Sequence, residues 1–185
     1  MQIKETDLPG VLLIEPKVFG DERGYFLETW SAERYGEQGL GIAFVQDNLS
    51  KSRRGTLRGL HLQHPHGQGK LVYVVTGEVF DVAVDVRVGS PTFGRWFGTL
   101  LSESNKRQMY IPTGYAHGFC VTSDEAIFAY KCTGGYRPEA EVTIAYDDPR
   151  LGIAWPVSAP TLSKKDLAGL RLADVPEARL PRYQP

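Results

Sequence analysis

A histidine flanked by basic side chains is the clearest chemical signal in this sequence. The stretch Arg58-Gly-Leu-His-Leu-Gln63 is followed by Gln68-Gly-Lys70, within a run that otherwise has the composition of a β-strand. An imidazole can take a proton near neutral pH, and neighbouring cations can hold an anion. These side chains therefore suit proton abstraction next to a carbonyl group, with the cations stabilising the charge that develops on the carbonyl oxygen.

Two further residues point the same way. His117 lies within Gly114-Tyr-Ala-His-Gly118, and Tyr130 is the lone tyrosine of a later strand-like run. The alternative for His117 is a structural hydrogen-bonding residue of a tight loop, and Tyr130 taken alone is more often a half-buried strand aromatic. Together with His61 they favour an enzyme over a non-catalytic β domain.

The spacing of Arg58 and His61 poses a geometric problem. Residues three apart in a regular strand point to opposite faces. Gly59 could host a β-bulge that turns both side chains inward, a feature common beside active sites. The alternative is that Arg58 is a solvated surface charge and His61 a core histidine.

The four histidines also allow a metal site. His61, His64, His66 and His117 resemble the ligand pattern of metal-binding β-barrels, in which imidazoles and one carboxylate hold a divalent ion. However, Pro65 separates two of them in a segment of loop composition, and no carboxylate follows within a few residues. We therefore expect no metal, and we interpret His64 and His66 as solvated loop residues.

The elements that must position these residues are mostly strands. In Glu78–Arg87, Phe80, Val82, Val84 and Val86 alternate with polar residues that include Asp81 and Asp85, so one face is apolar and the other faces either a cavity or solvent. Similar short runs occupy Val11–Glu15, Gly24–Thr29, Ala43–Asn48, Thr56–Gln63, Lys70–Val75, Arg95–Leu101, Arg107–Ile111, His117–Val121, Ala126–Cys132 and Val142–Tyr146.

These eleven runs predict an all-β sandwich or barrel rather than alternating βαβ units. Helical pattern is confined to Ser31–Gln38 and to a segment opening at Ser163, which could cap Lys164–Leu170. Residues 1–185 show no composition shift, so we expect one domain. The proline-containing tail, Pro176–Pro185, is expected to lie extended on the surface or on a partner subunit.

Composition excludes several classes of protein. The formal net charge of −1 over 185 residues argues against a general nucleic-acid or membrane-surface binder. No apolar run approaches the length of a membrane span, and Met1-Gln-Ile-Lys leads into polar sequence rather than a signal peptide. Cys120 and Cys132 lie in apolar surroundings, which favours reduced core thiols over a disulfide or a nucleophile. We therefore expect a cytoplasmic protein.

Many short motifs, taken in order, resemble one family, the dTDP-4-dehydrorhamnose 3,5-epimerases, and the resemblance runs from about Phe19 to Asp166. The motifs are Phe19-Gly-Asp-Glu-Arg-Gly24, Val45-Gln-Asp-Asn48, Leu57-Arg-Gly-Leu-His61, Gln68-Gly-Lys-Leu-Val72, Gly77-Glu-Val-Phe-Asp-Val-Ala-Val-Asp85, Gly89-Ser-Pro-Thr-Phe-Gly94, Asn105-Lys-Arg-Gln108, Ile111-Pro112, His117-Gly-Phe119, Tyr130-Lys131, and Leu162-Ser163 before Lys165-Asp166.

The resemblance implies a cupin-type jelly roll, usually a homodimer with an N-terminal strand exchanged between subunits, and no metal or other cofactor. It implies that His61 is the base, Asp166 the carboxylate that orients it, Tyr130 the acid on the opposite face of the sugar, and Lys70 the cation beside the keto oxygen. The implied substrate contacts are Arg23, Glu28, Gln46, Asp47, Asn48, Arg58, His117, Glu141 and Lys165, with Tyr136 stacking on the thymine.

The implied reaction is epimerisation of dTDP-4-dehydro-6-deoxy-D-glucose at carbons 3 and 5. Two departures stand out: the loop His64-Pro-His-Gly-Gln68 looks one residue short, and Gly134-Gly135 should make the support of Tyr136 flexible. The alternatives are a single-centre epimerase of a similar nucleotide sugar, a metal-dependent cupin oxygenase, and a non-catalytic sugar-binding barrel.

Overall fold

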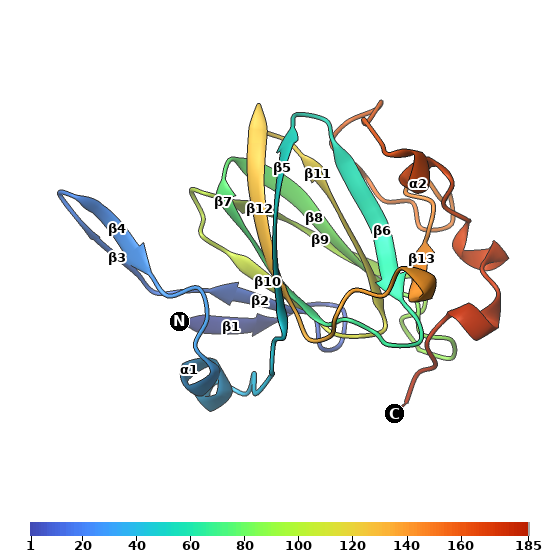
Figure 1. Ribbon diagram of the computed structural model, residues 1–185, viewed down its shortest axis with the longest axis horizontal. Helices are drawn as coiled ribbons and strands as arrows, with labels where there is room; N and C mark the ends of the chain where they lie inside the picture. Colours follow the sequence, from blue (N-terminus) through green and yellow to red (C-terminus); the bar gives the residue numbers. More distant parts are fainter. Residues whose placement is uncertain (185) are drawn as a thin grey trace.

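Two antiparallel β-sheets face each other in the computed structural model, which describes residues 1–184 (Figure 1). One sheet has the order β1-β2-β10-β7-β12-β5 and the other β13-β6-β11-β8-β9. The strands are β1 (Gln2–Glu5), β2 (Leu12–Glu15), β5 (Gln46–Arg53), β6 (Leu57–Gln63), β7 (Lys70–Thr76), β8 (Glu78–Asp85), β9 (Trp96–Ser102), β10 (Gln108–Ile111), β11 (Tyr115–Val121), β12 (Glu125–Cys132) and β13 (Glu141–Thr143). The expected all-β, cupin-type jelly roll is confirmed.

Strand β8 shows why the sheets pack as they do. Val79 and Ala83 point into the central core between the sheets, whereas Val82, Val84 and Val86 belong to a second core on the outer face. Both faces of the strand are therefore buried, and apolar residues on alternate positions supply each core.

The two aspartates of β8 lie on its inner face and do not reach solvent. Asp81 and Asp85 are both 0% exposed. The question left open by the sequence is thus settled for both carboxylates, which need partners inside the protein.

The C-terminal segment covers the outer face of the five-stranded sheet (Figure 1, orange to red). It contains α2 (Lys164–Leu167), η2 (Leu172–Asp174) and η3 (Glu177–Arg179), and follows η1 (Pro138–Ala140). Leu180 in the tail is buried, and Arg182 forms a bridge with Val88. The tail therefore packs on its own chain, and α2 is shorter than the sequence predicted.

The N-terminal region closes one edge of the six-stranded sheet. The helix α1 (Ala32–Glu37) begins after Ser31, as predicted, and buries Tyr35 against Ile14 and Leu71. Strand β1 pairs with β2 of the same chain. The exchange of an N-terminal strand between subunits, which the family resemblance implies, stays a prediction. No helix among residues 1–184 is long and apolar enough to cross a membrane.

A hairpin of two strands projects from the body of the protein. Strands β3 (Val18–Asp21) and β4 (Gly24–Leu27) pair only with each other and extend away from both sheets (Figure 1). Phe19, Tyr25 and Phe26 on this hairpin are all more than half exposed. Such an aromatic surface is typical of an element that packs on a partner.

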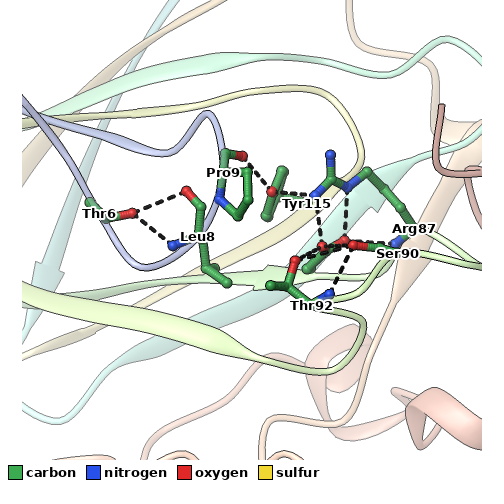
Figure 2. Close-up of polar contacts among 8 residues, drawn as sticks. Thr6, Leu8, Pro9, Arg87, Ser90, Thr92 and Tyr115 are labelled. Carbon is green, nitrogen blue, oxygen red and sulfur yellow. Dashed lines mark hydrogen bonds and ion pairs between the residues drawn. The ribbon is translucent and has the colours of Figure 1, made fainter. Parts of the chain in front are cut away.

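A buried polar network joins the loops at one end of the sandwich. Asp85 accepts hydrogen bonds from Arg87, Ser90 and Thr92, and Arg87 also donates to the Tyr115 hydroxyl (Figure 2). Tyr115 in turn donates to the carbonyl of Pro9, 2.6 Å away. The network fixes the β1–β2 loop against the loop that follows β8.

Candidate active site

A cavity of about 540 Å³ opens between the two sheets and collects most of the predicted site residues. Its walls come from β5, β6, β7, β11 and β12, with the segment after β12 and α2 at the rim. Eleven predicted residues line it: Gln46, Asn48, Arg58, His61, Lys70, His117, Tyr130, Tyr136, Glu141, Lys165 and Asp166. Six residues that were not predicted to belong to the site also line it: Ser50, Leu62, Gln63, Phe119, Phe128 and Cys132.

The predicted irregularity at Gly59 is present. His117 pairs with His61 and Phe119 pairs with Arg58, so the register between β11 and β6 shifts at this point. Gly59 has φ of 126°, and a Cβ there would lie 2.5 Å from Gly118 Cα. Only glycine fits this backbone, and the shift brings both Arg58 and His61 to the cavity.

His61 forms a hydrogen-bonded pair with Asp166. His61 Nε2 lies 2.6 Å from Asp166 Oδ1, and the carboxyl is 4% exposed. Burial alone would raise the pKa of Asp166, but hydrogen bonds from His61 and Ser163 outweigh it and lower that pKa to about 2. The ionised carboxylate keeps the proton of the imidazole on Nε2, which leaves the other ring nitrogen as the proton acceptor.

Tyr130 and Lys70 come from the opposite sheet. Tyr130 lies on β12, and burial raises the pKa of its phenol, so the hydroxyl keeps its proton at neutral pH. Lys70 begins the neighbouring strand β7, and burial lowers the pKa of its ammonium group. Among the described residues, Lys70 forms no ion pair within 4 Å, so this cation is available to a ligand.

Cys132 lies directly opposite Lys70 in the β7–β12 pairing. The thiol is buried and free, and burial raises its pKa, so it is a neutral group of the cavity wall. Cys120 is also buried and free, as the sequence predicted for both thiols.

His117 is held by a carboxylate that the sequence did not assign to the site. Its Nε2 lies 3.0 and 3.1 Å from the two carboxylate oxygens of Asp81. Burial lowers the pKa of His117 and raises the pKa of Asp81, because each ionised form is costly away from water. Alternation in the sequence put Asp81 on the polar face of its strand but did not show whether that face meets the cavity or solvent.

The rim around Tyr136 is more rigid than its two preceding glycines suggested. Gln63 accepts from the Arg137 N–H at 2.8 Å and donates to the Gly135 carbonyl, while Gln68 donates to the Gly134 carbonyl at 2.7 Å. These bonds fix the backbone on both sides of Tyr136.

Glu141 links the aromatic rim to α2. It accepts from the Tyr136 hydroxyl at 2.9 Å and from Lys165 Nζ at 2.7 Å. Gln46 accepts from the Tyr136 N–H and donates to Asn48, which completes this side of the opening. The rim thus offers an aromatic face, amides and one ion pair to a ligand.

Three predicted contact residues lie outside the cavity of this chain. Asp47 points to the opposite face of β5, because neighbouring strand residues alternate, and its carboxylate binds Lys131 Nζ at 2.9 Å. Arg23 lies on the projecting hairpin, paired with Asp21, and Glu28 follows the hairpin, paired with Arg34. Asp47 therefore does not line this cavity, and its contact with the substrate stays a prediction.

The described residues contain no cluster of metal-ligating side chains. Among residues 1–184, no three His, Cys, Asp or Glu side chains lie close enough together to hold an ion. His61 and His117 line the cavity, and His64 and His66 belong to the loop between β6 and β7.

Comparison with known proteins identifies the family. The family model described as dTDP-4-dehydrorhamnose 3,5-epimerase matches residues 5–174. A protein of that name from Shigella flexneri is 54% identical over 176 residues, covering 94% of this chain and 97% of the relative. The dTDP-4-dehydrorhamnose 3-epimerase of Streptomyces niveus is 43% identical over 186 residues, covering 99% and 90%.

A solved structure agrees with the sequence comparison. The dTDP-6-deoxy-D-glucose-3,5-epimerase of Legionella pneumophila, crystallised with dTDP-4-keto-L-rhamnose, superposes with a TM-score of 0.96 and 55% identity, covering 100% of this chain and 99% of that one. The chain belongs to the dTDP-4-dehydrorhamnose 3,5-epimerase family.

Proposed function

We propose that this protein epimerises dTDP-4-dehydro-6-deoxy-D-glucose at carbons 3 and 5, giving dTDP-4-dehydro-L-rhamnose. The observation that carries the proposal is the placement of a base and an acid on opposite walls of one cavity. His61, paired with Asp166, comes from the five-stranded sheet, and Tyr130 comes from the six-stranded sheet. Inverting a carbon centre requires removal of its proton on one face and delivery on the other.

The reaction follows from the acidity of hydrogens next to a ketone. The 4-keto group acidifies the hydrogens on carbons 3 and 5. The free ring nitrogen of His61 takes one of these protons, and the electron pair of the broken C–H bond moves onto the keto oxygen as an enolate. The Lys70 ammonium group stabilises this charge, which is present mainly in the transition state and intermediate. Tyr130 then delivers a proton to the opposite face, and the ketone re-forms.

A single-centre epimerase is the second candidate, because the Streptomyces niveus relative carries that name at 43% identity. Both activities use the same enolate chemistry, so the presence of His61 and Tyr130 does not separate them. They differ in whether one or both carbons exchange protons with solvent.

Proton NMR of the substrate incubated with the protein in heavy water separates them. We expect the signals of the hydrogens on carbon 3 and carbon 5 both to disappear, with His61→Ala as the matched control that retains both. Loss at one carbon alone would assign the protein to the single-centre branch. No exchange at either carbon would discard epimerisation of this substrate and favour the oxygenase or the non-catalytic barrel, which elemental analysis for bound metal would distinguish.

We also propose that the protein is a homodimer in which the β3–β4 hairpin of each subunit lies against the partner. The exposed aromatics of the hairpin support this, as do Val45, directly before β5, and Leu49 on the outer face of β5, which are 66% and 69% exposed. Arg23 and Glu28 would then reach the cavity of the partner subunit instead of their own.

A mixing experiment tests the shared site. Arg23→Ala and His61→Ala are each expected to be nearly inactive, and the mixed heterodimer would have one intact site. Refolding the two variants together at equal amounts should restore about a quarter of wild-type activity, since half of the dimers are mixed and each has one working site. A monomer by light scattering, or no recovery on mixing, would exclude the shared site.

The protein is inferred to act in the cytoplasm. Two free, buried cysteines suit a reducing compartment. Fractionation of cells that produce the protein would test this inference.

A further inference from the structure

The Ser163 hydroxyl makes two hydrogen bonds at the start of α2. Its hydroxyl oxygen accepts from the Asp166 N–H at 3.1 Å, which is the ordinary role of a residue that caps a helix. The same hydroxyl donates to Asp166 Oδ2 at 2.6 Å. A side chain that only caps a helix does not form this second bond, in which the hydroxyl contacts the Asp166 carboxylate directly.

The two oxygens of the Asp166 carboxylate are therefore held from two sides. Oδ1 lies 2.6 Å from His61 Nε2. Oδ2 accepts from the Ser163 hydroxyl at 2.6 Å and also from the Ser163 backbone N–H at 3.4 Å. A carboxylate with one oxygen anchored cannot rotate freely about its last bond, so the other oxygen stays in line with the imidazole.

The segment that carries this serine is itself fixed to the sheet. Thr161 lies beside Thr56 in a parallel bridge, and its carbonyl accepts from the Leu57 N–H at 3.0 Å. After the helix, the Leu170 N–H donates to the Thr143 carbonyl at 3.1 Å. Because both ends are tied to strands β6 and β13, Ser163 has a defined position relative to His61.

We propose that Ser163 is a positioning residue of the proton-transfer site, whose hydroxyl holds the Asp166 carboxylate against His61 and stabilises its negative charge. The inference rests on the proposed function and deepens it. Without this donor, the negative charge on Asp166 is less well stabilised and holds the Nε2 proton of His61 more strongly. The protonated imidazole is then favoured, and a protonated imidazole cannot act as a base.

Other charged groups face the pair and must be held constant in any test. Glu141 and Lys165 form an ion pair at the rim, 2.7 Å apart. His117, hydrogen-bonded to Asp81, lies across the strand pairing from His61. Lys70 and Arg58 line the same cavity. None of these side chains contacts the Ser163 hydroxyl through a hydrogen bond in the described structure, so substitution of Ser163 leaves them in place.

The experiment compares Ser163→Ala with Ser163→Thr and Ser163→Gly. Threonine keeps the hydroxyl, whereas glycine removes it yet still starts a helix with a small loss. Ser31→Ala is the matched control, because Ser31 caps α1 in the same way, accepting from the Arg34 N–H, and does not line the cavity. The readouts are the pH dependence of kcat/KM and the NMR titration of the His61 ring, assigned by its loss in His61→Gln.

We expect the acidic limb of kcat/KM and the midpoint of the His61 NMR titration to lie at higher pH in Ser163→Ala and Ser163→Gly than in the wild-type protein. Near neutral pH, kcat/KM should fall about tenfold, a typical effect of removing support from a catalytic group. Ser163→Thr should restore both values, and Ser31→Ala should change neither.

Equal rate losses at every pH would show that Ser163 only stabilises the helix and would overturn the proposal. A threonine variant that behaves like alanine would do the same. The NMR titration needs no substrate, so it decides the role of Ser163 even if the wild-type protein proves not to epimerise the nucleotide sugar. In that case the proposed function would be wrong, while the titration would still show whether Ser163 positions Asp166.

Discussion

His61 and Asp166 are separated by 105 positions in the sequence, yet His61 Nε2 and Asp166 Oδ1 lie 2.6 Å apart. The histidine is on a strand of the five-stranded sheet, and the aspartate is on a four-residue helix in the segment that packs over that sheet. The C-terminal segment thus has two roles: it covers the outer core and supplies the partner of the base.

The first prediction concerns the acid and the base. His61→Ala and Tyr130→Phe should each lower turnover by about 10²- to 10⁴-fold, the usual contribution of a positioned acid or base. Binding of dTDP should be largely kept, because neither substitution changes the rim around Tyr136. Steady-state kinetics and calorimetric titration with dTDP measure the two effects separately. Near-wild-type rates in both variants would exclude the mechanism.

The second prediction concerns Lys70. Lys70→Gln should lower kcat by about 10²- to 10³-fold, because the charge that it stabilises develops in the transition state. Burial lowers the pKa of Lys70, so its charge is lost as the pH rises through a value below the ordinary lysine range. The wild-type rate should therefore decline on an alkaline limb that begins below that range and is absent in Lys70→Gln. A loss expressed mainly in KM would instead assign Lys70 to substrate binding.

Local sequence rules predicted the parts of the site that depend on short-range geometry. The bulge at Gly59 was expected because Arg58 and His61, three residues apart in a strand, could face the same side only if the strand were irregular. The start of α2 was expected at Ser163 because serine is a preferred residue at the N-cap of a helix. The family resemblance implied most of the cavity lining, because its motifs coincide with the strands that form the walls.

Features that depend on how strands and segments pack were not predictable in this way. Alternation alone says that Asp47 and Asn48 face opposite sides of β5, yet nothing in the sequence says which side is the cavity. Asp81 could be placed only once both faces of β8 were known to be buried. Gln63 acts through backbone groups of a segment more than 70 positions away, which leaves no local pattern.

The third prediction concerns this glutamine. Gln63→Met keeps the length of the side chain and removes its hydrogen bonds to Gly135 and Arg137 beside Tyr136, together with its bond to the His66 carbonyl. We expect dTDP to bind about tenfold more weakly, because the aromatic rim loses the bonds that fix its backbone. The rate of proton exchange at saturating substrate should change little, since His61 and Asp166 are untouched. Unchanged dTDP affinity would show that Tyr136 is held without Gln63.

The last prediction concerns stability and the network of Figure 2. Burial alone would raise the pKa of Asp85, but hydrogen bonds from Arg87, Ser90 and Thr92 outweigh it and hold the pKa below the ordinary value of 3.8. A carboxyl with a lowered pKa in the folded state stabilises the protein above its ordinary pKa, and this contribution is lost as the pH falls through the folded value.

Asp85→Asn should therefore lower the free energy of unfolding by about 3 to 5 kcal/mol at neutral pH, because it leaves Arg87 without its buried partner. The difference from wild type should shrink in acid, below the ordinary carboxyl range. Asp124→Asn is the matched control, since Asp124 pairs with Arg54 but its side chain is 96% exposed, and exposed pairs contribute little. Urea unfolding at several pH values measures both variants. A loss for Asp85→Asn that stays constant with pH would show that the ionised carboxylate is not the stabilising form.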